Sequence, residues 1–318
     1  MDNLIFSLNA TIPVFLVIVV GYILRKTGML GEGFIKDANK FNFNVTLPCL
    51  LVNDLMNCGI KENFEFKYVS YCFLTTLACI VITWVLAKIF MKDKSIIGEF
   101  VQGAYRGSAA VLGIALIQNI QGDSGMGPLM IVGSVPLYNA FAVIILTLEA
   151  PKKDATLSFS KTLKKALIGV LKNPMIISIL IGVLLSYFEI TLPVIAEKTI
   201  SSLAKITTPL ALITIGAAFE GTKALKMIKP TILASTIKLI IQPLIFLPVA
   251  AWMGFNSSEI VALLIMYGAP TTASCFIMSK NMNHEGTLSS SIIVLTTLLS
   301  AFTVTFWIWV LKSFGCIS

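Results

Sequence analysis

Three basic residues lie deep inside long apolar runs of the sequence, where charges are rare: Arg106, Lys205 and Lys238. A charged side chain in hydrocarbon is costly, so such residues usually face a transport pathway, a partner or a water-filled cavity. The acidic residues that could neutralise these cations lie toward the ends of the apolar runs. The excess of buried positive charge therefore predicts an anionic ligand. The alternative is a structural role, in which a cation extends to the membrane surface or bonds to backbone carbonyls.

Two segments rich in small residues, 107–113 and 268–272, interrupt runs of this kind. Pro270 lacks a backbone donor and disfavours helical geometry at Ala269, which predicts a broken helix there. The ends of broken helices can offer N–H groups to a carboxylate. The alternative is that small residues only allow close helix packing. The candidate substrate-binding residues are Arg106, Gly107, Ser108, Gly113, Asn139, Tyr267, Ala269, Pro270, Thr271, Thr272, Asn44, Lys205 and Lys238.

These residues fall within apolar runs of about 20 residues, the length that crosses roughly 30 Å of hydrocarbon. Hydrophobic residues make up 56% of the 318 and charged residues only 13%, which excludes a water-soluble domain. The predicted fold class is an all-α integral membrane protein with ten transmembrane helices. The predicted spans are 4–24, 34–56, 68–90, 96–120, 127–148, 174–188, 192–219, 228–253, 259–278 and 287–311.

The basic residues predict the orientation of these spans. Most of the 24 Lys and Arg residues lie in loops that share one side of the membrane if the N-terminus is outside. We therefore expect a multi-pass protein of the cell (plasma) membrane with both termini outside. Residues 1–8 lack the features of a secretory signal, so the first run is counted as a span. Basic residues in short loops do not form the single face that nucleic acid requires, despite a net charge of +8.

An internal repeat relates the two halves of the chain. A shift of 161 positions superposes five pairs of residues, which are Pro13 and Pro174, Gly21 and Gly182, Thr46 and Thr207, Pro48 and Pro209, and Gly107 and Gly268. Each half then holds five spans, and an odd number inverts the second half relative to the first. The expected organisation is a first repeat at 1–150, a cytoplasmic loop at 151–173 and an inverted second repeat at 174–318. The spacing of apolar residues in this loop predicts an amphipathic helix on the inner leaflet or a basic extension of the sixth span.

Several motifs resemble those of the auxin efflux carrier family, which includes bacterial malate and malonate permease-like proteins. The resemblance covers nearly the whole chain. In the first half, the motifs are Asn-Lys-Phe-Asn-Phe-Asn-Val-Thr-Leu-Pro at 39–48, Arg106-Gly107, Leu-Gly-Ile at 112–114, and Tyr138-Asn139. In the second half, they are Asn173-Pro174, Thr-Pro-Leu-Ala-Leu at 208–212 with Gly216, Lys238-Leu239 followed by Pro243, and Ala269-Pro270.

This resemblance implies a ten-helix inverted-repeat transporter in which the fourth and ninth helices cross at the midplane. It implies that a substrate, commonly a carboxylate, binds beside the crossover in an elevator-type cycle. The chain departs from the family pattern at two positions near the presumed site. Ser108 stands where the family usually has asparagine, and Ala115 stands where it usually has proline.

Other classes of protein find less support. The sequence has no HExxH, G-x-S-x-G or P-loop motif and one histidine, so we do not expect an enzyme, a metal site or a cofactor. Its six cysteines form no C-x-x-C pair and are interpreted as packing residues. A passive anion channel and a sodium-coupled organic anion symporter of related fold are the alternatives. The expected partners are a small organic anion and the lipid bilayer, with a homodimer as an option and without nucleic acid.

Overall fold

The computed structural model describes residues 2–56, 65–109, 113–121, 125–150, 168, 172–219 and 221–317. Within these ranges all regular secondary structure is helical, apart from one isolated bridge between two residues. Five of the described helices are long and apolar enough to cross a membrane. They are Phe66–Phe90, Gly127–Leu148, Val194–Ala218, Ile228–Trp252 and Thr287–Ser313. The predicted amphipathic segment falls almost entirely outside the described residues.

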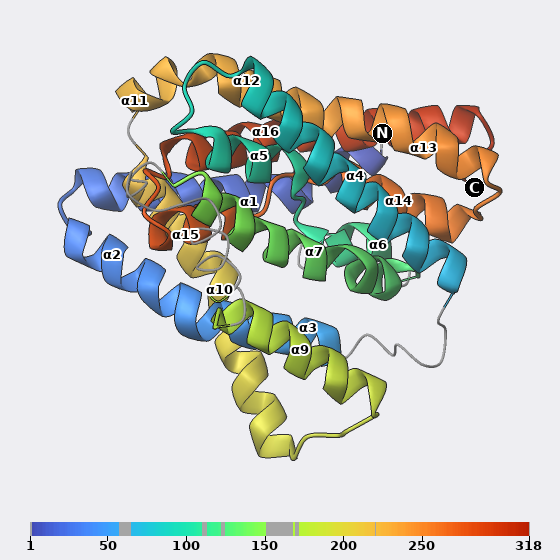
Figure 1. Cartoon of the computed structure of the whole chain (residues 1–318), viewed down its shortest axis with the longest axis horizontal. Helices are drawn as coiled ribbons and strands as arrows, with labels where there is room; N and C mark the ends of the chain where they lie inside the picture. The colour runs from blue at the N-terminus through green and yellow to red at the C-terminus, as the bar shows by residue number, and fades with distance from the viewer. Residues whose placement is uncertain are drawn as a thin grey trace.

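The helices follow the predicted spans closely (Figure 1). In the first half they are α1 (Asp2–Lys26), α2 (Glu32–Phe41), the π-helical η1 (Asn42–Thr46), α3 (Leu47–Met56), α4 (Phe66–Phe90), α5 (Ile97–Tyr105), α6 (Ile114–Gln121) and α7 (Gly127–Leu148). In the second half they are α9 (Pro174–Tyr187), α10 (Val194–Ala218), α11 (Gly221–Lys226), α12 (Ile228–Thr236), the π-helical η3 (Ile237–Ile241), α13 (Gln242–Trp252), α14 (Ser257–Gly268), α15 (Ser274–Asn281) and α16 (Thr287–Ser313). The fourth and ninth predicted spans are each divided into two helices.

Local signals in the sequence explain where several helices begin. Asn173 precedes α9, and its side-chain Oδ1 accepts a hydrogen bond from the Met175 N–H at 2.9 Å, with Pro174 in the first helical position. Asn256 and Glu259 form a reciprocal capping box at the start of α14. These caps satisfy N–H groups that have no partner inside the helix.

The helices pack in two groups. Helix α10 packs against α1 and α3, and α3 packs against α9, whereas α4 packs against α5 and α7 and α12 packs against α16. Helix α1 contacts both α10 and α16, so it joins the two groups (Figure 1). The largest buried cluster is built mostly from α3 to α7, α13, α14 and α16, with further residues from α9, α10, α12 and α15. The divided helices α5–α6 and α14–α15 lie within this packed region.

Helices α1 and α10 approach each other so closely that glycine is required. A Cβ atom on Gly216 would overlap the carbonyl oxygen of Ile18, and one on Gly21 would overlap the carbonyl oxygen of Ile213. Small residues of this kind let helix backbones come together, as is common in membrane proteins. The contact joins an element of the first predicted repeat to an element of the second.

Candidate functional site

Two interrupted helices meet at one point in the structure. Helix α5 ends at Tyr105 and Arg106 continues in an extended conformation, while α14 ends at Gly268 and Ala269 is also extended. Gly107 and Thr271 then pair as an antiparallel bridge, and the Ser108 N–H donates to the Pro270 carbonyl oxygen at 2.8 Å. The structure thus confirms the helix break predicted at Pro270. It also confirms the break predicted in the fourth span, which it places at Arg106 to Ser108, overlapping the predicted segment 107–113. We call this junction the crossover.

Polar side chains satisfy the backbone groups that the breaks release. The Thr271 hydroxyl donates to the Gly103 carbonyl oxygen at 2.8 Å, and the Thr271 N–H donates to the Thr296 hydroxyl of α16 at 3.1 Å. The Gln102 side-chain amide donates to the Cys275 carbonyl oxygen at 3.0 Å. Irregular backbone at membrane depth is tolerated only with such partners. These hydrogen bonds therefore stabilise the irregular backbone of the crossover.

A cavity of about 70 Å³ adjoins the crossover. This volume exceeds the space that a water molecule needs. Its walls come from α1, α3, α7, α10, α15, α16 and the crossover itself. The described polar residues that line it are Asp54, Arg106, Ser108, Tyr138, Asn139, Thr207, Thr208, Thr271, Thr272, Ser274 and Thr297.

Arg106 is the cationic residue among the described lining residues of this cavity. It is only 4% exposed, and its guanidinium donates to the Asn139 side-chain oxygen at 2.5 Å and to the Met278 sulfur at 2.9 Å. The Asn139 amide nitrogen donates to the Val135 carbonyl oxygen at 3.0 Å, which directs the amide oxygen toward Arg106. Both partners of the guanidinium are neutral, so its positive charge is not cancelled by these contacts.

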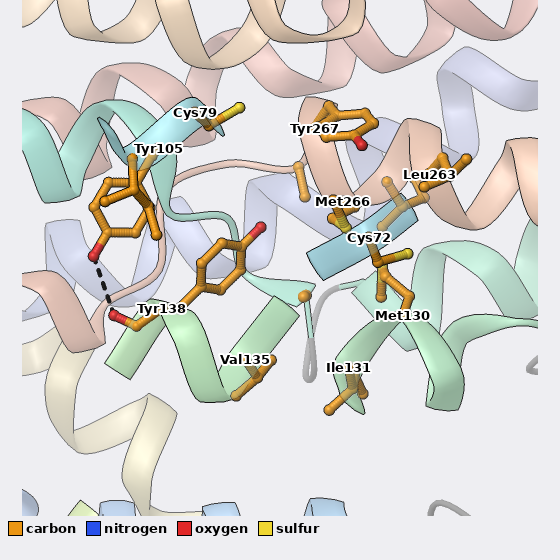
Figure 2. Packing of buried hydrophobic residues seen from close by; sticks show 14 of the residues in the cluster. Cys72, Cys79, Tyr105, Met130, Ile131, Val135, Tyr138, Leu263, Met266 and Tyr267 are labelled. Atoms are coloured by element: carbon orange, nitrogen blue, oxygen red, sulfur yellow. Dashed lines mark hydrogen bonds between the residues drawn. The ribbon is translucent and has the colours of Figure 1, made fainter. Parts of the chain in front are cut away.

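Aromatic packing holds Arg106 next to α7. The Tyr105 hydroxyl donates to the Tyr138 carbonyl oxygen at 3.1 Å, and the two rings lie 5.8 Å apart between centroids. Figure 2 shows this pair among the buried residues around the divided helices. Because Tyr105 ends α5 and Tyr138 precedes Asn139, the contact fixes the arginine beside its amide partner.

Lys238 lies against the crossover but does not line the cavity. Its ammonium donates to the Met266 carbonyl oxygen at 2.8 Å, and a Cβ atom at Gly107 would lie 2.9 Å from the ammonium nitrogen. The lysine is completely buried. A side chain at position 107 would therefore require a shift of the Lys238 ammonium or of the Met266 carbonyl group.

The candidate residues fall into three groups. Arg106, Gly107, Ser108, Asn139, Thr271 and Thr272 line the cavity. Gly113, Tyr267, Ala269, Pro270 and Lys238 form or support the crossover without lining the cavity; the Gly113 N–H donates to the Ser108 carbonyl oxygen, and the Tyr267 hydroxyl bonds to Thr75. Asn44 and Lys205 are exposed and are not among the residues that line the cavity.

Asn44 and Lys205 differ from their expected positions because depth along a span does not determine the face of the helix. In η1 the buried residues are Asn42 and Thr46, whereas Asn44 between them is exposed and donates to the Lys40 carbonyl oxygen. Lys205 follows the buried Ala204 on an exposed face of α10. The residues that the sequence reasoning missed include Thr207 and Thr208, which carry no charge to single them out.

A change at Pro270 tests the importance of the break in α14. We expect Pro270→Ala to slow transport more than it reduces expression or folding, because alanine restores an N–H and permits helical geometry at Ala269. Flux into proteoliposomes, compared with the melting temperature, measures both effects. Pro248→Ala is the matched control, since Pro248 lies inside the uninterrupted α13. Unchanged flux in Pro270→Ala would count against a functional role for the break.

Divided helices that cross beside a polar cavity, in a chain of apolar helices, are typical of secondary transporters. A family model described as "Membrane transport protein" matches residues 6–308. The chain belongs to this family, which is the auxin efflux carrier family, and is a multi-pass membrane protein of a transporter family rather than of an enzyme family.

A relative from Methanothermobacter thermautotrophicus is similar along the whole chain. It is 20% identical over 304 residues, which cover 95% of this chain and 97% of the relative, and it is described as an uncharacterized transporter. The similarity therefore extends through both halves of the chain.

Proposed function

We propose that this protein is a secondary active or facilitative transporter of a small organic anion, with a carboxylate as the preferred class. The observation that carries the proposal is the buried guanidinium of Arg106, which borders the cavity and has neutral protein partners. Guanidinium groups bind carboxylates through paired, charge-assisted hydrogen bonds. A bound carboxylate would add a negatively charged partner to the neutral groups that the guanidinium contacts.

The start of α15 supports the same class of ligand. Thr272, Ala273 and Ser274 line the cavity at the N-terminal end of this helix. Helix N-termini carry partial positive charge, which favours anions. An arginine and a helix N-terminus therefore border one cavity from the two sides of the crossover.

The proposed cycle is alternating access of the elevator type, in the plasma membrane with both chain termini outside. The resemblance to the auxin efflux carrier family supports this proposal, because it implies that the substrate binds beside the crossover. Electrical recording from bilayers distinguishes this transporter from the passive channel. Single-channel currents would contradict the proposal, because a carrier turns over far more slowly than an open pore conducts.

A thermal-shift screen tests the substrate class. The purified protein is heated with monocarboxylates, dicarboxylates, sulfonates, aromatic acids and neutral amino acids. A ligand that binds only the folded state adds about 2.7 kcal/mol of stability at a hundredfold excess over Kd. We expect stabilisation by one class of anion. Stabilisation only by neutral compounds or cations would overturn the proposal.

Asp54 places a carboxyl group in the same cavity as Arg106. It is the acidic residue among the described lining residues. A negative charge in the cavity would repel an anionic ligand.

We expect Asp54→Asn to bind the anion more tightly than the wild type, because the change removes this carboxyl group from the cavity. Binding titrations with a ligand from the screen measure both Kd values. Asp37→Asn, at an exposed position on α2, is the control. Equal affinity in the wild type and Asp54→Asn would show that Asp54 does not affect anion binding.

A further inference from the structure

The crossover brings together two helix ends that carry partial negative charge. Helices α5 and α14 both run into the crossover with their C-termini, at Tyr105 and Gly268. The last carbonyl groups of a helix lack partners within it and carry the negative end of the helix dipole. In transporters with broken helices, such ends and the unwound carbonyls beside them can hold Na⁺ or take part in proton coupling.

Two side chains of one membrane helix occupy this place in the present structure. The Lys238 ammonium donates to the Met266 carbonyl oxygen of α14 at 2.8 Å. The Gln242 side-chain amide donates to the Ala104 carbonyl oxygen of α5 at 2.8 Å. The two side chains also contact each other, with 3.4 Å between the Lys238 Nζ and the Gln242 Oε1. Together they bind one carbonyl from the last turn of each divided helix.

The membrane helix that carries Lys238 and Gln242 departs from regular α-helical geometry at these residues. Lys238 lies in the π-helical η3, and Gln242 is the first residue of α13. The Trp307 indole N–H of α16 donates to the Leu239 carbonyl oxygen at 3.0 Å, which satisfies a backbone group in the wider turn. Single-turn π-helical segments inside α-helices are often found at functional sites.

The contacts of Lys238 resemble those of a bound monovalent cation. Its two hydrogen-bond acceptors are a backbone carbonyl and a side-chain amide oxygen, and both are neutral. The ammonium lies against Gly107 and is completely buried. Among the described residues, no salt bridge is formed by Lys238. An ammonium held by neutral oxygens at converging helix C-termini supplies the same charge that a sodium ion would supply.

We propose that the Lys238 ammonium is the resident cation of the crossover and that anion binding and transport consequently do not require Na⁺. Lys238 is then a positioning residue, because it holds the ends of α5 and α14 and does not contact the substrate. The inference about transport depends on the proposed function, whereas the cation role of Lys238 can be measured on the protein without substrate.

The test compares melting temperatures in sodium chloride and in choline chloride for three proteins: the wild type, Lys238→Ala and Lys229→Ala. Lys229 is the matched control, since it lies exposed on α12 of the same membrane span. We expect the wild type and Lys229→Ala to melt at the same temperature in both salts. We expect Lys238→Ala to melt several degrees lower in choline chloride and to recover part of the loss in sodium chloride, because Na⁺ enters the vacated position.

The salt dependence separates a cation role from simple packing, which sodium would not restore. A wild type that needs Na⁺ for stability or for anion binding would overturn the proposal. It would also be overturned by a Lys238→Ala protein that melts equally in both salts. If Lys238→Ala cannot be purified, Na⁺ titration of wild-type stability and ligand affinity still decides the question. A wild type that is independent of Na⁺ but binds no anion would count against the proposed function alone.

Discussion

Arg106→Ala is expected to weaken anion binding roughly a hundredfold, a loss of about 3 kcal/mol, which is in the range for removing one member of a buried, hydrogen-bonded charge pair. The guanidinium is buried at the cavity wall and is held by Asn139 and Met278. Isothermal titration or thermal shift with the ligand from the screen measures the loss.

Two further variants make this result specific. Arg25→Ala removes the other arginine of the chain, which pairs with Glu32 on a partly exposed surface, and should bind the anion as the wild type does. Arg106→Lys keeps the charge but loses the planar pair of donors, and we expect intermediate affinity. A folded Arg106→Ala protein with wild-type affinity would refute the assignment of the site.

The largest loss of stability is expected at Glu99. Its carboxylate is 2% exposed and accepts hydrogen bonds from the Gly286 N–H at 2.8 Å, the Ser289 N–H at 2.8 Å and the Ser289 hydroxyl at 3.0 Å. Gly286 is the N-cap residue of α16 and adopts a left-handed conformation with φ of 76°. The carboxylate thus caps α16 from the first turn of α5, across 187 positions of sequence.

We expect Glu99→Ala to lower the free energy of unfolding by about 3 kcal/mol, because it leaves buried N–H groups without an acceptor. Glu99→Gln should lose less, since its amide oxygen still accepts one bond. Denaturant or thermal melts in detergent compare these variants with Glu197→Ala, at an exposed position on α10. A melting temperature like that of the wild type in Glu99→Ala would show that the cap is dispensable.

The positions of the helices could be predicted because long apolar runs are required by the thickness of the membrane. The predicted range 127–148 coincides with α7, and 287–311 differs from α16 by only two residues. The break at Pro270 followed from the chemistry of proline. The break after Tyr105 has no proline, and it is maintained by tertiary contacts such as the bridge between Gly107 and Thr271. The number of membrane crossings and the inverted repeat remain predictions.

The candidate site was harder to predict than the helices, because the sequence ranks residues by charge and depth and does not give their direction. Arg106, Lys205 and Lys238 looked equivalent, yet the structure places them at the cavity, on an exposed surface and against the crossover, respectively. Two buried acidic residues also differ in how far the sequence reveals their roles. Glu259 belongs to a capping box that the pattern Asn-Ser-Ser-Glu at 256–259 could have revealed, whereas Glu99 caps a helix distant in sequence.

The glycine contact between α1 and α10 limits how the molecule can move. Because Gly21 and Gly216 place backbone against backbone, rotation or sliding of either helix would drive Ile18 or Ile213 into its neighbour. Packed elements of this kind change position as a unit rather than deform gradually. We therefore expect α1 and α10 to move, or to stay still, as one unit, and we expect any relative movement of parts of the molecule to occur at other surfaces.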